Sequence, residues 1–429
     1  MRQLFKSCIV AILTFEAKVV LRRSKPTIIA ITGSVGKTST KDAIFTVLKD
    51  TYRTRKSQKS FNSEIGVPLS ILALPNAWDS VWGWTQNIID GFFIAFFSRQ
   101  YPQVLVLEVG VDRPGDMANI TKWLKPDIVV MTRLPDVPVH VEYFGTPEAV
   151  VAEKMELAKA LKPDGIFIYN NDDIKLQEVA KEVRQKSFGY SRYLQSHFTA
   201  SEDKVIYNDD IPVGMSLVLS HLTKKVTMRI EGSIGIQHNY TIAAAAAVAS
   251  HFDISLERVA AALEGHVPAP GRMQIIPGLK HTIILDDTYN ASPIAMELAL
   301  QTLGEIRGAK RKIAVLGDMM ELGQFSSNEH ERIGALVPKC ADMLLTLGIR
   351  SRKIAEGALE NGLSEKVIWQ YDDIARAGRE LQNFLQPGDV VLIKASQSIR
   401  AERVVEEIMA EPERASELLV RQDSSWKTR

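Results

Sequence analysis

Residues 32–39 read TGSVGKTS and directly follow an apolar run, TIIAIT at 27–32, which we expect to form a β-strand that enters this loop. Glycines allow backbone amides to turn toward phosphate oxygens, and the N-terminus of the helix expected next adds partial positive charge. Lys37 would supply a cation for terminal phosphates, and Thr38 a hydroxyl ligand for magnesium. The commoner GxxxxGK[ST] pattern would need glycine at Ile31, so this loop is a shorter variant. The loop predicts a phosphate site whose candidate residues are Gly33, Ser34, Val35, Gly36, Lys37, Thr38 and Ser39.

The overall composition is typical of a globular protein with more than one domain. The chain has 429 residues, of which 45% are hydrophobic and 24% charged. Its formal net charge of +1 gives no electrostatic reason to expect nucleic acid as a partner. The two cysteines, Cys8 and Cys340, lie far apart, which argues against a disulfide framework or a thiolate metal site. We therefore expect a cytoplasmic protein, and we expect it to be a monomer.

Short apolar runs alternate with helical stretches along most of the chain. The expected strands of the first half are Thr27–Thr32, Val104–Val109, Asp127–Met131 and Gly165–Tyr169, and those of the second half are Thr282–Leu285, Lys312–Leu316, Met343–Leu347, Val367–Trp369 and Val390–Ile393. This alternation predicts an α/β fold in which parallel-rich sheets carry helices on both faces. Between them, residues 188–231 read as a small antiparallel appendage, and Pro268–Arg272 reads as a linker. The expected domains are an N-terminal helix (1–25), a central ATP-binding domain (26–269) and a Rossmann-like C-terminal domain (270–429).

The N-terminal stretch has two interpretations. Apolar residues between Leu4 and Leu21 form an approximate helical stripe, but charged residues interrupt it, so it does not predict a spanning helix. One interpretation is a helix packed on the first domain, and the other is peripheral membrane contact through residues 1–23. The second would place the protein at the inner face of the plasma membrane. A segment rich in aromatics raises the same choice between core and an exposed surface for substrate or membrane: Trp78, Trp82, Trp84, Phe92, Phe93, Phe96 and Phe97.

Several segments together resemble the Mur ligases. The phosphate loop has their form TG[ST]xGKT[ST], and residues 61–69, FNSEIGVPL, resemble their NxxxGVPL segment. Residues 107–116, 286–293 (DDTYNASP) and 315–323 (VLGDMMELG) are similar to motifs of the MurF branch of that family. The resemblance runs from about Thr27 to Glu406. It implies an ATP-dependent amide-bond ligase that acts in peptidoglycan precursor synthesis through an acyl phosphate.

The resemblance also implies a metal site. Glu108 ends a predicted buried strand, where a carboxylate opposite Thr38 can hold magnesium, although an acidic strand end can also simply cap a helix. By resemblance, His140 binds a second magnesium ion and Lys154 is carbamylated, which converts a cation into a carboxylate-like ligand. Spacing alone would make both residues structural. The implied cofactors are therefore ATP and two Mg²⁺ ions, with the catalytic set Lys37, Glu108, His140, Lys154 and Arg272.

Further residues are assigned by resemblance to the two substrates. Asn239 would contact adenine, Asp287 the ribose, and Arg272 the phosphates when the domains close. Tyr289 is also a candidate for binding the nucleotide. Arg272 could instead be a solvated linker residue. The family's second asparagine after Asn239 is absent, and residues 392–400 depart from its LVKGSR pattern. The candidate residues for the substrates are Asn62, Asn290, Asp318, Lys394 and Ser396.

The nature of the substrates is the most open question. MurF-type enzymes carry a nucleotide-binding domain before the phosphate loop, whereas 32 residues precede Gly33 here. We expect a nucleotide-sugar peptide as the carboxyl substrate, UDP-N-acetylmuramoyl-tripeptide by resemblance, and D-alanyl-D-alanine as the amine. The alternatives are a Mur-like or folylpolyglutamate-type ligase with another carboxyl substrate or acceptor, and a membrane-associated nucleotide-binding scaffold without ligase activity.

Overall fold

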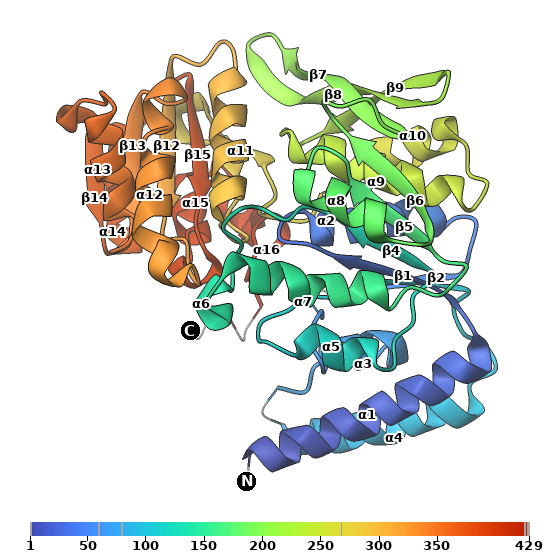
Figure 1. Cartoon of the computed structure of the whole chain (residues 1–429). Helices are drawn as coiled ribbons and strands as arrows, with labels where there is room; N and C mark the ends of the chain where they lie inside the picture. The colour runs from blue at the N-terminus through green and yellow to red at the C-terminus, as the bar shows by residue number, and fades with distance from the viewer. Residues whose placement is uncertain (1, 59–60, 79, 267, 424–425, 427–429) are drawn as a thin grey trace.

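The computed structural model describes residues 2–58, 61–78, 80–266, 268–423 and 426, and it contains two sheets (Figure 1). The first has nine strands in the order β2-β3-β1-β4-β5-β6-β7-β8-β9. Strands β1–β9 span Thr27–Thr32, Thr54–Lys56, Val104–Glu108, Ile128–Met131, Ile166–Asn170, Lys186–Ser191, Phe198–Asn208, Ile211–His221 and Lys224–Glu231. Helices α1–α10 span Arg2–Ser24, Lys37–Leu48, Gly66–Leu72, Val81–Phe97, Asp116–Thr121, Val141–Phe144, Pro147–Lys159, Ile174–Glu182, Gln237–Ser250 and Leu256–Glu264. We call this part the central domain.

The second sheet has six strands in the order β10-β11-β15-β12-β13-β14, and we call this part the C-terminal domain. Its strands β10–β15 span Gln274–Gly278, Thr282–Asp286, Arg311–Gly317, Met343–Leu347, Ile368–Tyr371 and Asp389–Lys394. Its helices α11–α16 span Pro293–Glu305, Ser326–Gly334, Arg352–Glu360, Ile374–Phe384, Glu402–Ile408 and Ala415–Leu418. The predicted α/β class with two parallel-rich sheets is confirmed.

Strand β1 lies at the point where the chain reverses its direction of travel across the first sheet. It pairs in parallel with β3 on one side and with β4 on the other. Ligands of open α/β sheets bind beyond the carboxyl ends of strands at such a switch point. The loop after β1 and the end of β3 therefore lie side by side, which brings Thr38 next to Glu108.

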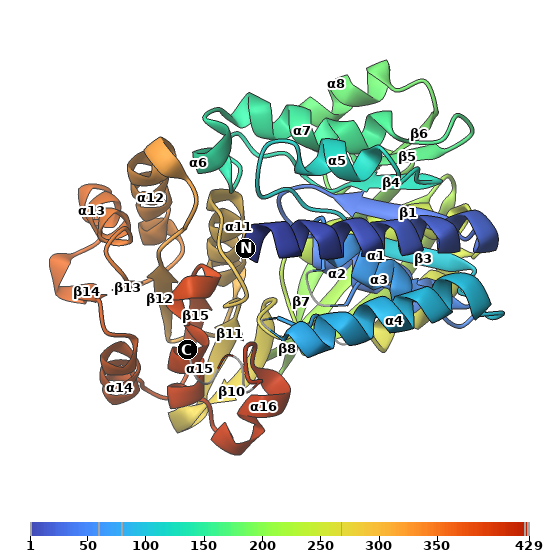
Figure 2. The same ribbon diagram turned by 90° about the horizontal axis from the view of Figure 1, so that it is seen from below.

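Two layers of helices cover the first sheet (Figures 1 and 2). Strand side chains alternate between the faces, so β1 sends Ile29 and Ile31 to one core and Ile28 and Ala30 to the other. Helices α2, α9 and α10 pack on the first face, and α9 is rich in alanine, which lets it lie close to α2. Helices α1, α3, α4, α5 and α7 form the other layer.

The segment expected to be an appendage is part of the main sheet. Strands β7, β8 and β9 are antiparallel to one another, as predicted, but β7 pairs in parallel with β6 at Tyr190 and Phe198. These strands therefore extend the nine-stranded sheet, and the prediction of a separate appendage is wrong. Their alternating buried and exposed residues arise because only one face of this extension is covered.

The N-terminal helix packs on the central domain through one side only. Leu13, Ala17 and Val20 are buried, whereas Phe15 remains exposed. Of the seven aromatic residues between Trp78 and Phe97, Trp84 is buried and the others are exposed, so the core interpretation is wrong for most of them. Within the described residues no helix is long and apolar enough to cross a membrane.

Candidate active site

The phosphate loop between β1 and α2 needs glycine at two positions. Gly33 has a φ of +139°, and a Cβ added there would lie 2.0 Å from Thr132 Oγ1. Gly36 has a φ of +85° and directly precedes the first residue of α2. Residues with a side chain disfavour both backbone conformations, so the loop can follow this path only with glycine at the two positions. The Lys37 ammonium donates to the Gly33 carbonyl at 3.0 Å, which folds it back over the loop.

Glu108, at the carboxyl end of β3, is buried and surrounded by polar groups. The Thr38 hydroxyl donates to its Oε2 at 2.9 Å, and the Asn62 amide donates to its Oε1 at 3.2 Å. Lys41 Nζ lies 3.7 Å from the same carboxylate. A carboxylate beside a hydroxyl at the mouth of a phosphate loop has the chemistry of a magnesium site. Among the described residues, no group of three or more His, Cys, Asp or Glu side chains is placed so that it could hold a metal ion by itself.

Lys154, on α7, lies beneath the loop and is almost fully buried. Its ammonium donates to Ser34 Oγ at 2.8 Å. Burial and the nearby charge of Lys37 hold the pKa of Lys154 well below its ordinary value. The lowered pKa favours the uncharged amine, which is the form that reacts with carbon dioxide.

His140 lies at the boundary between the two domains. It has a φ of +71°, and its Nδ1 is 2.7 Å from Glu321 Oε2 in the C-terminal domain. Its Nε2 is 3.8 Å from Asp112, a residue that the sequence reasoning did not select although it lies within the quoted segment 107–116. The imidazole lowers the pKa of the Glu321 carboxyl. The domains therefore meet at a residue predicted to bind metal.

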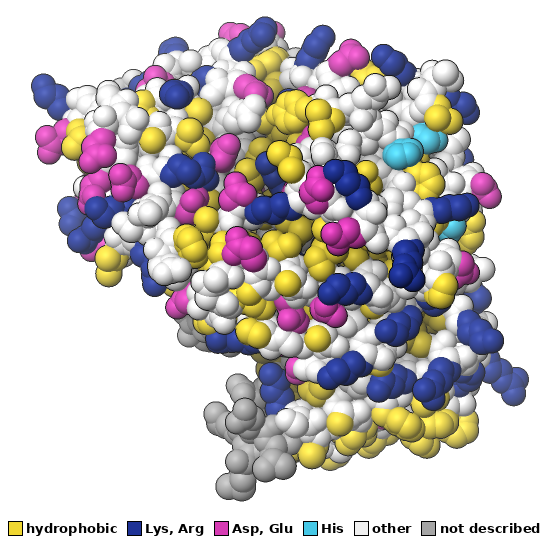
Figure 3. Space-filling model, in the orientation of Figure 1, with side chains coloured by type: hydrophobic (Ala, Val, Ile, Leu, Met, Phe, Trp, Pro, Cys, Tyr) yellow, Lys and Arg dark blue, Asp and Glu magenta, His cyan; other side chains and the backbone are white. Residues whose placement is uncertain are grey.

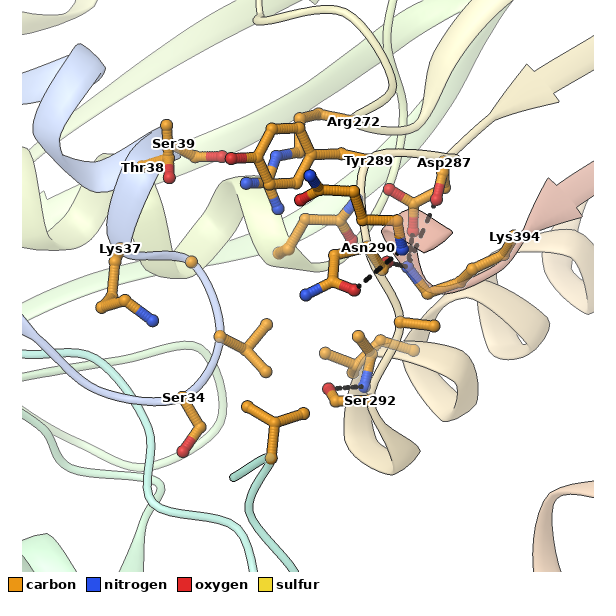
Figure 4. Close-up of a pocket in the computed structure, with 18 of the residues that line it drawn as sticks. Ser34, Lys37, Thr38, Ser39, Arg272, Asp287, Tyr289, Asn290, Ser292 and Lys394 are labelled. Carbon is orange, nitrogen blue, oxygen red and sulfur yellow. Dashed lines mark hydrogen bonds and ion pairs between the residues drawn. The ribbon is translucent and has the colours of Figure 1, made fainter. Parts of the chain in front are cut away.

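The C-terminal domain brings a second set of side chains to the same cavity (Figure 4). Lys394, at the end of β15, donates to Asp287 Oδ2 at 2.5 Å and to the Asn290 carbonyl at 2.9 Å. Arg272 stacks on the Tyr289 ring at 3.9 Å. Strands β11 and β15 are parallel neighbours, so both present these groups at one edge of the sheet. That edge faces the phosphate loop.

Most of the predicted site residues line this cavity. They are Ser34, Val35, Gly36, Lys37, Thr38, Ser39, Asn62, Glu108, His140, Arg272, Asp287, Tyr289, Asn290 and Lys394. Gly33 lies within the loop and Lys154 beneath it, and neither lines the cavity. Asp318 and Ser396 lie deeper in the C-terminal domain, where Ser396 N donates to the Asp318 carbonyl at 3.0 Å.

Asn239 does not reach the cavity in this structure. Its amide group donates to the Ala200 carbonyl and to Asp203, at 3.0 and 2.9 Å. The preceding residues Gln237 and His238 line the cavity instead. The sequence reasoning passed over both, because the family pattern draws attention to the asparagine. A contact of Asn239 with adenine stays a prediction.

Comparison with known proteins identifies the family of the chain. The model of the Mur ligase middle domain matches residues 31–82 and 85–249, and the model of the Mur ligase glutamate ligase domain matches residues 271–397. The chain belongs to the Mur ligase family. Mur ligases are ATP-dependent ligases that use Mg²⁺, so the chain is an enzyme of that class, as predicted.

Several similar proteins and solved structures carry the name of the MurF ligase. The UDP-N-acetylmuramoyl-tripeptide–D-alanyl-D-alanine ligase of Bacillus subtilis is 30% identical over 92% of this chain and 79% of its own. The enzyme of the same name from Mycobacterium leprae is 31% identical over 87% and 71%. The MurF ligase of Thermotoga maritima, solved with ADP, superimposes with a TM-score of 0.76 at 26% identity, covering 94% of this chain and 84% of that one. The predicted resemblance to MurF is confirmed.

Proposed function

We propose that this Mur ligase joins D-alanyl-D-alanine to a UDP-N-acetylmuramoyl-tripeptide in peptidoglycan precursor synthesis. One observation carries the proposal: the carboxyl ends of strands from the two domains face each other across one cavity. The ATP-type loop with Glu108 lies on one side, and Asp287, Asn290 and Lys394 lie on the other. The names of the Bacillus and Mycobacterium relatives supply the substrates.

The reaction follows from the chemistry of these groups. A carboxylate oxygen of the tripeptide attacks the γ-phosphorus of ATP, and ADP leaves with the bridging oxygen. Lys37 and Arg272 offset the negative charge that spreads over the transferring phosphoryl group. The dipeptide amine then attacks the acyl carbon, loses a proton, and phosphate leaves with the former carboxylate oxygen.

The metal ligands form a second part of the proposal. Thr38 and Glu108 would hold one Mg²⁺ ion, and His140 with carbamylated Lys154 would hold another. The ions supply positive charge to the phosphate oxygens. Support comes from the hydrogen bond between Thr38 and Glu108 and from the burial of Lys154, which lowers the pKa of its amine.

The remaining assignments concern substrate groups. Asp287 and Tyr289 would contact the ribose, and Asn239 the adenine after a local rearrangement. Asn62, Asn290, Asp318, Lys394 and Ser396 would line the paths of the tripeptide and the amine. We also propose the domain limits 26–269 and 270–429 and a monomeric state.

The test is phosphate release measured over a matrix of UDP-muramoyl peptides and amine acceptors, with the product masses determined. The proposal expects release only when UDP-N-acetylmuramoyl-tripeptide and D-alanyl-D-alanine are both present, and a product that contains both. Phosphate release with another pair of substrates would change the assigned substrates but leave the assignment as a ligase unchanged. ATP binding without release for any pair would favour the nucleotide-binding scaffold.

A further inference from the structure

Helices α1 and α4 form a pair on the outside of the central domain (Figures 1 and 2). They lie so close that a Cβ added to Gly91 would be 2.1 Å from Glu16 Oε2. Arg23 donates to the carbonyls of Ile94 and Ser98, so the two helices end at the same place. The inner side of the pair is part of the apolar core beneath the sheet. The pair is therefore a fixed part of the fold.

The outer side of this pair is strongly apolar. Along α4, Ile89, Phe92, Phe93 and Phe96 recur at helical spacing and are exposed. The aromatic side chains of this side are between 44% and 78% exposed: Phe15, Trp82, Phe92, Phe93, Phe96 and Phe97. Hydrophobic side chains gather along the lower edge of the molecule, where Figure 1 places these helices (Figure 3). Monomeric proteins rarely expose so many apolar side chains together without a partner.

Basic residues border the apolar side. Arg22, Lys25 and Arg99 are exposed and lie where the two helices end. Residues 5–25 and 80–99 contain six basic residues and two acidic ones, although the whole chain has a net charge of only +1. This local excess of positive charge complements an anionic surface.

The apolar side also contains a hollow between the two helices. Its walls are apolar, formed by Ile12, Ile88, Phe92 and Phe96, and Glu16 lies at its floor. Glu16 Oε2 has no hydrogen-bond partner, and burial raises its pKa to about 7. A neutral carboxyl group can lie under hydrocarbon at far lower cost than a carboxylate.

We infer that the outer side of α1 and α4 docks on an anionic lipid bilayer. The aromatic side chains would enter the boundary between headgroups and acyl chains, and Arg22, Lys25 and Arg99 would contact the phosphate groups. Neither helix can span, so the contact is peripheral. A second copy fits less well, because the helix pair offers only two acidic residues, Glu16 and Asp90, to its six basic ones. The inference is independent of the proposed substrates.

The experiment is co-sedimentation of the full chain with vesicles of phosphatidylcholine alone or with phosphatidylglycerol added. Binding is expected with the anionic vesicles, and it should weaken as salt is raised. Phe93→Ser combined with Phe97→Ser should reduce partitioning about tenfold or more. Arg22→Gln combined with Arg99→Gln should reduce it mainly at low salt. Leu222→Ser removes an exposed side chain from the distant β8–β9 turn and should change nothing.

Two readouts make the result decisive. The far-ultraviolet circular dichroism spectrum and the midpoint of thermal unfolding should be the same in all variants, which shows that they fold. Trp82 fluorescence should shift to shorter wavelength with anionic vesicles, and the shift should disappear in Trp82→Phe. Absence of binding to anionic vesicles at low salt would overturn the inference. So would a concentration-dependent dimer, seen by sedimentation, that the phenylalanine variants abolish.

Discussion

His140 Nδ1 of the central domain lies 2.7 Å from Glu321 Oε2 of the C-terminal domain. A carboxylate that contacts one nitrogen of a histidine fixes the ring, so the other nitrogen is presented in a defined direction. Here that nitrogen faces Asp112 and the cavity. The way in which the two domains meet therefore sets the orientation of His140, a predicted metal ligand.

Glu321→Gln should weaken this link without unfolding the protein. Loss of an outer carboxylate typically costs 10- to 100-fold in metal affinity or activity. We therefore expect Mn²⁺ binding, measured by electron paramagnetic resonance with ATP present, to weaken by about tenfold or more. Glu331→Gln, an exposed change in α12, is the matched control. Equal Mn²⁺ binding in both variants would contradict the link.

Lys154 should carry a carbamate. The protein incubated with ¹³C-bicarbonate should show a carbamate resonance that is absent from Lys154→Arg, because a guanidinium group does not react in this way. Lys159→Arg, at an exposed position of the same helix, should keep the resonance. A carbamate signal that survives Lys154→Arg would assign the modification to another amine.

Gly33→Ala should destabilise the protein more than a comparable glycine change. Gly33 and Gly115 both have positive φ, so an alanine at either costs about 1–2 kcal/mol of backbone strain. At Gly33 the new Cβ would also meet Thr132 Oγ1, whereas nothing lies within 4 Å at Gly115. Overpacking adds about 1–3 kcal/mol. Urea unfolding should rank Gly33→Ala well below Gly115→Ala, and equal values would contradict the steric account.

Asp286 should make stability depend on pH. Burial raises its pKa to about 6, above the ordinary value near 4, so the folded state disfavours the charged form. Its contribution to stability should fall as pH rises from about 4 to about 6, by up to about 3 kcal/mol, and stay constant above. Asp286→Asn stays neutral and should remove this slope in urea unfolding. A slope of unchanged size would show that other groups cause it.

The sequence predicted the strands well because buried parallel strands are short apolar runs. Thr27–Thr32 and Met343–Leu347 have the predicted bounds, and the other predicted strands differ at their ends by one or two residues. The short edge strand β2 was missed because Thr54–Lys56 has no apolar pattern. Most of the motifs located cavity residues, since the phosphate loop and the segments 107–116 and 286–293 lie at the carboxyl ends of strands.

Relationships across the fold could not be predicted in the same way. The contact of His140 with Glu321 joins segments 181 residues apart and depends on how the domains meet. The orientation of Asn239 depends on Asp203, which no motif contains. The exposure of Phe93 and Phe97 depends on which side of α4 the sheet covers.

The most direct test of the ligase mechanism uses UDP-N-acetylmuramoyl-tripeptide labelled with ¹⁸O in its terminal carboxyl group. Attack of that carboxylate on ATP transfers one of its oxygens to the phosphate that is later released. Mass spectrometry should therefore find one ¹⁸O atom in each phosphate formed in the presence of D-alanyl-D-alanine. Unlabelled phosphate released together with the peptide product would contradict the acyl phosphate and, with it, the account of this site.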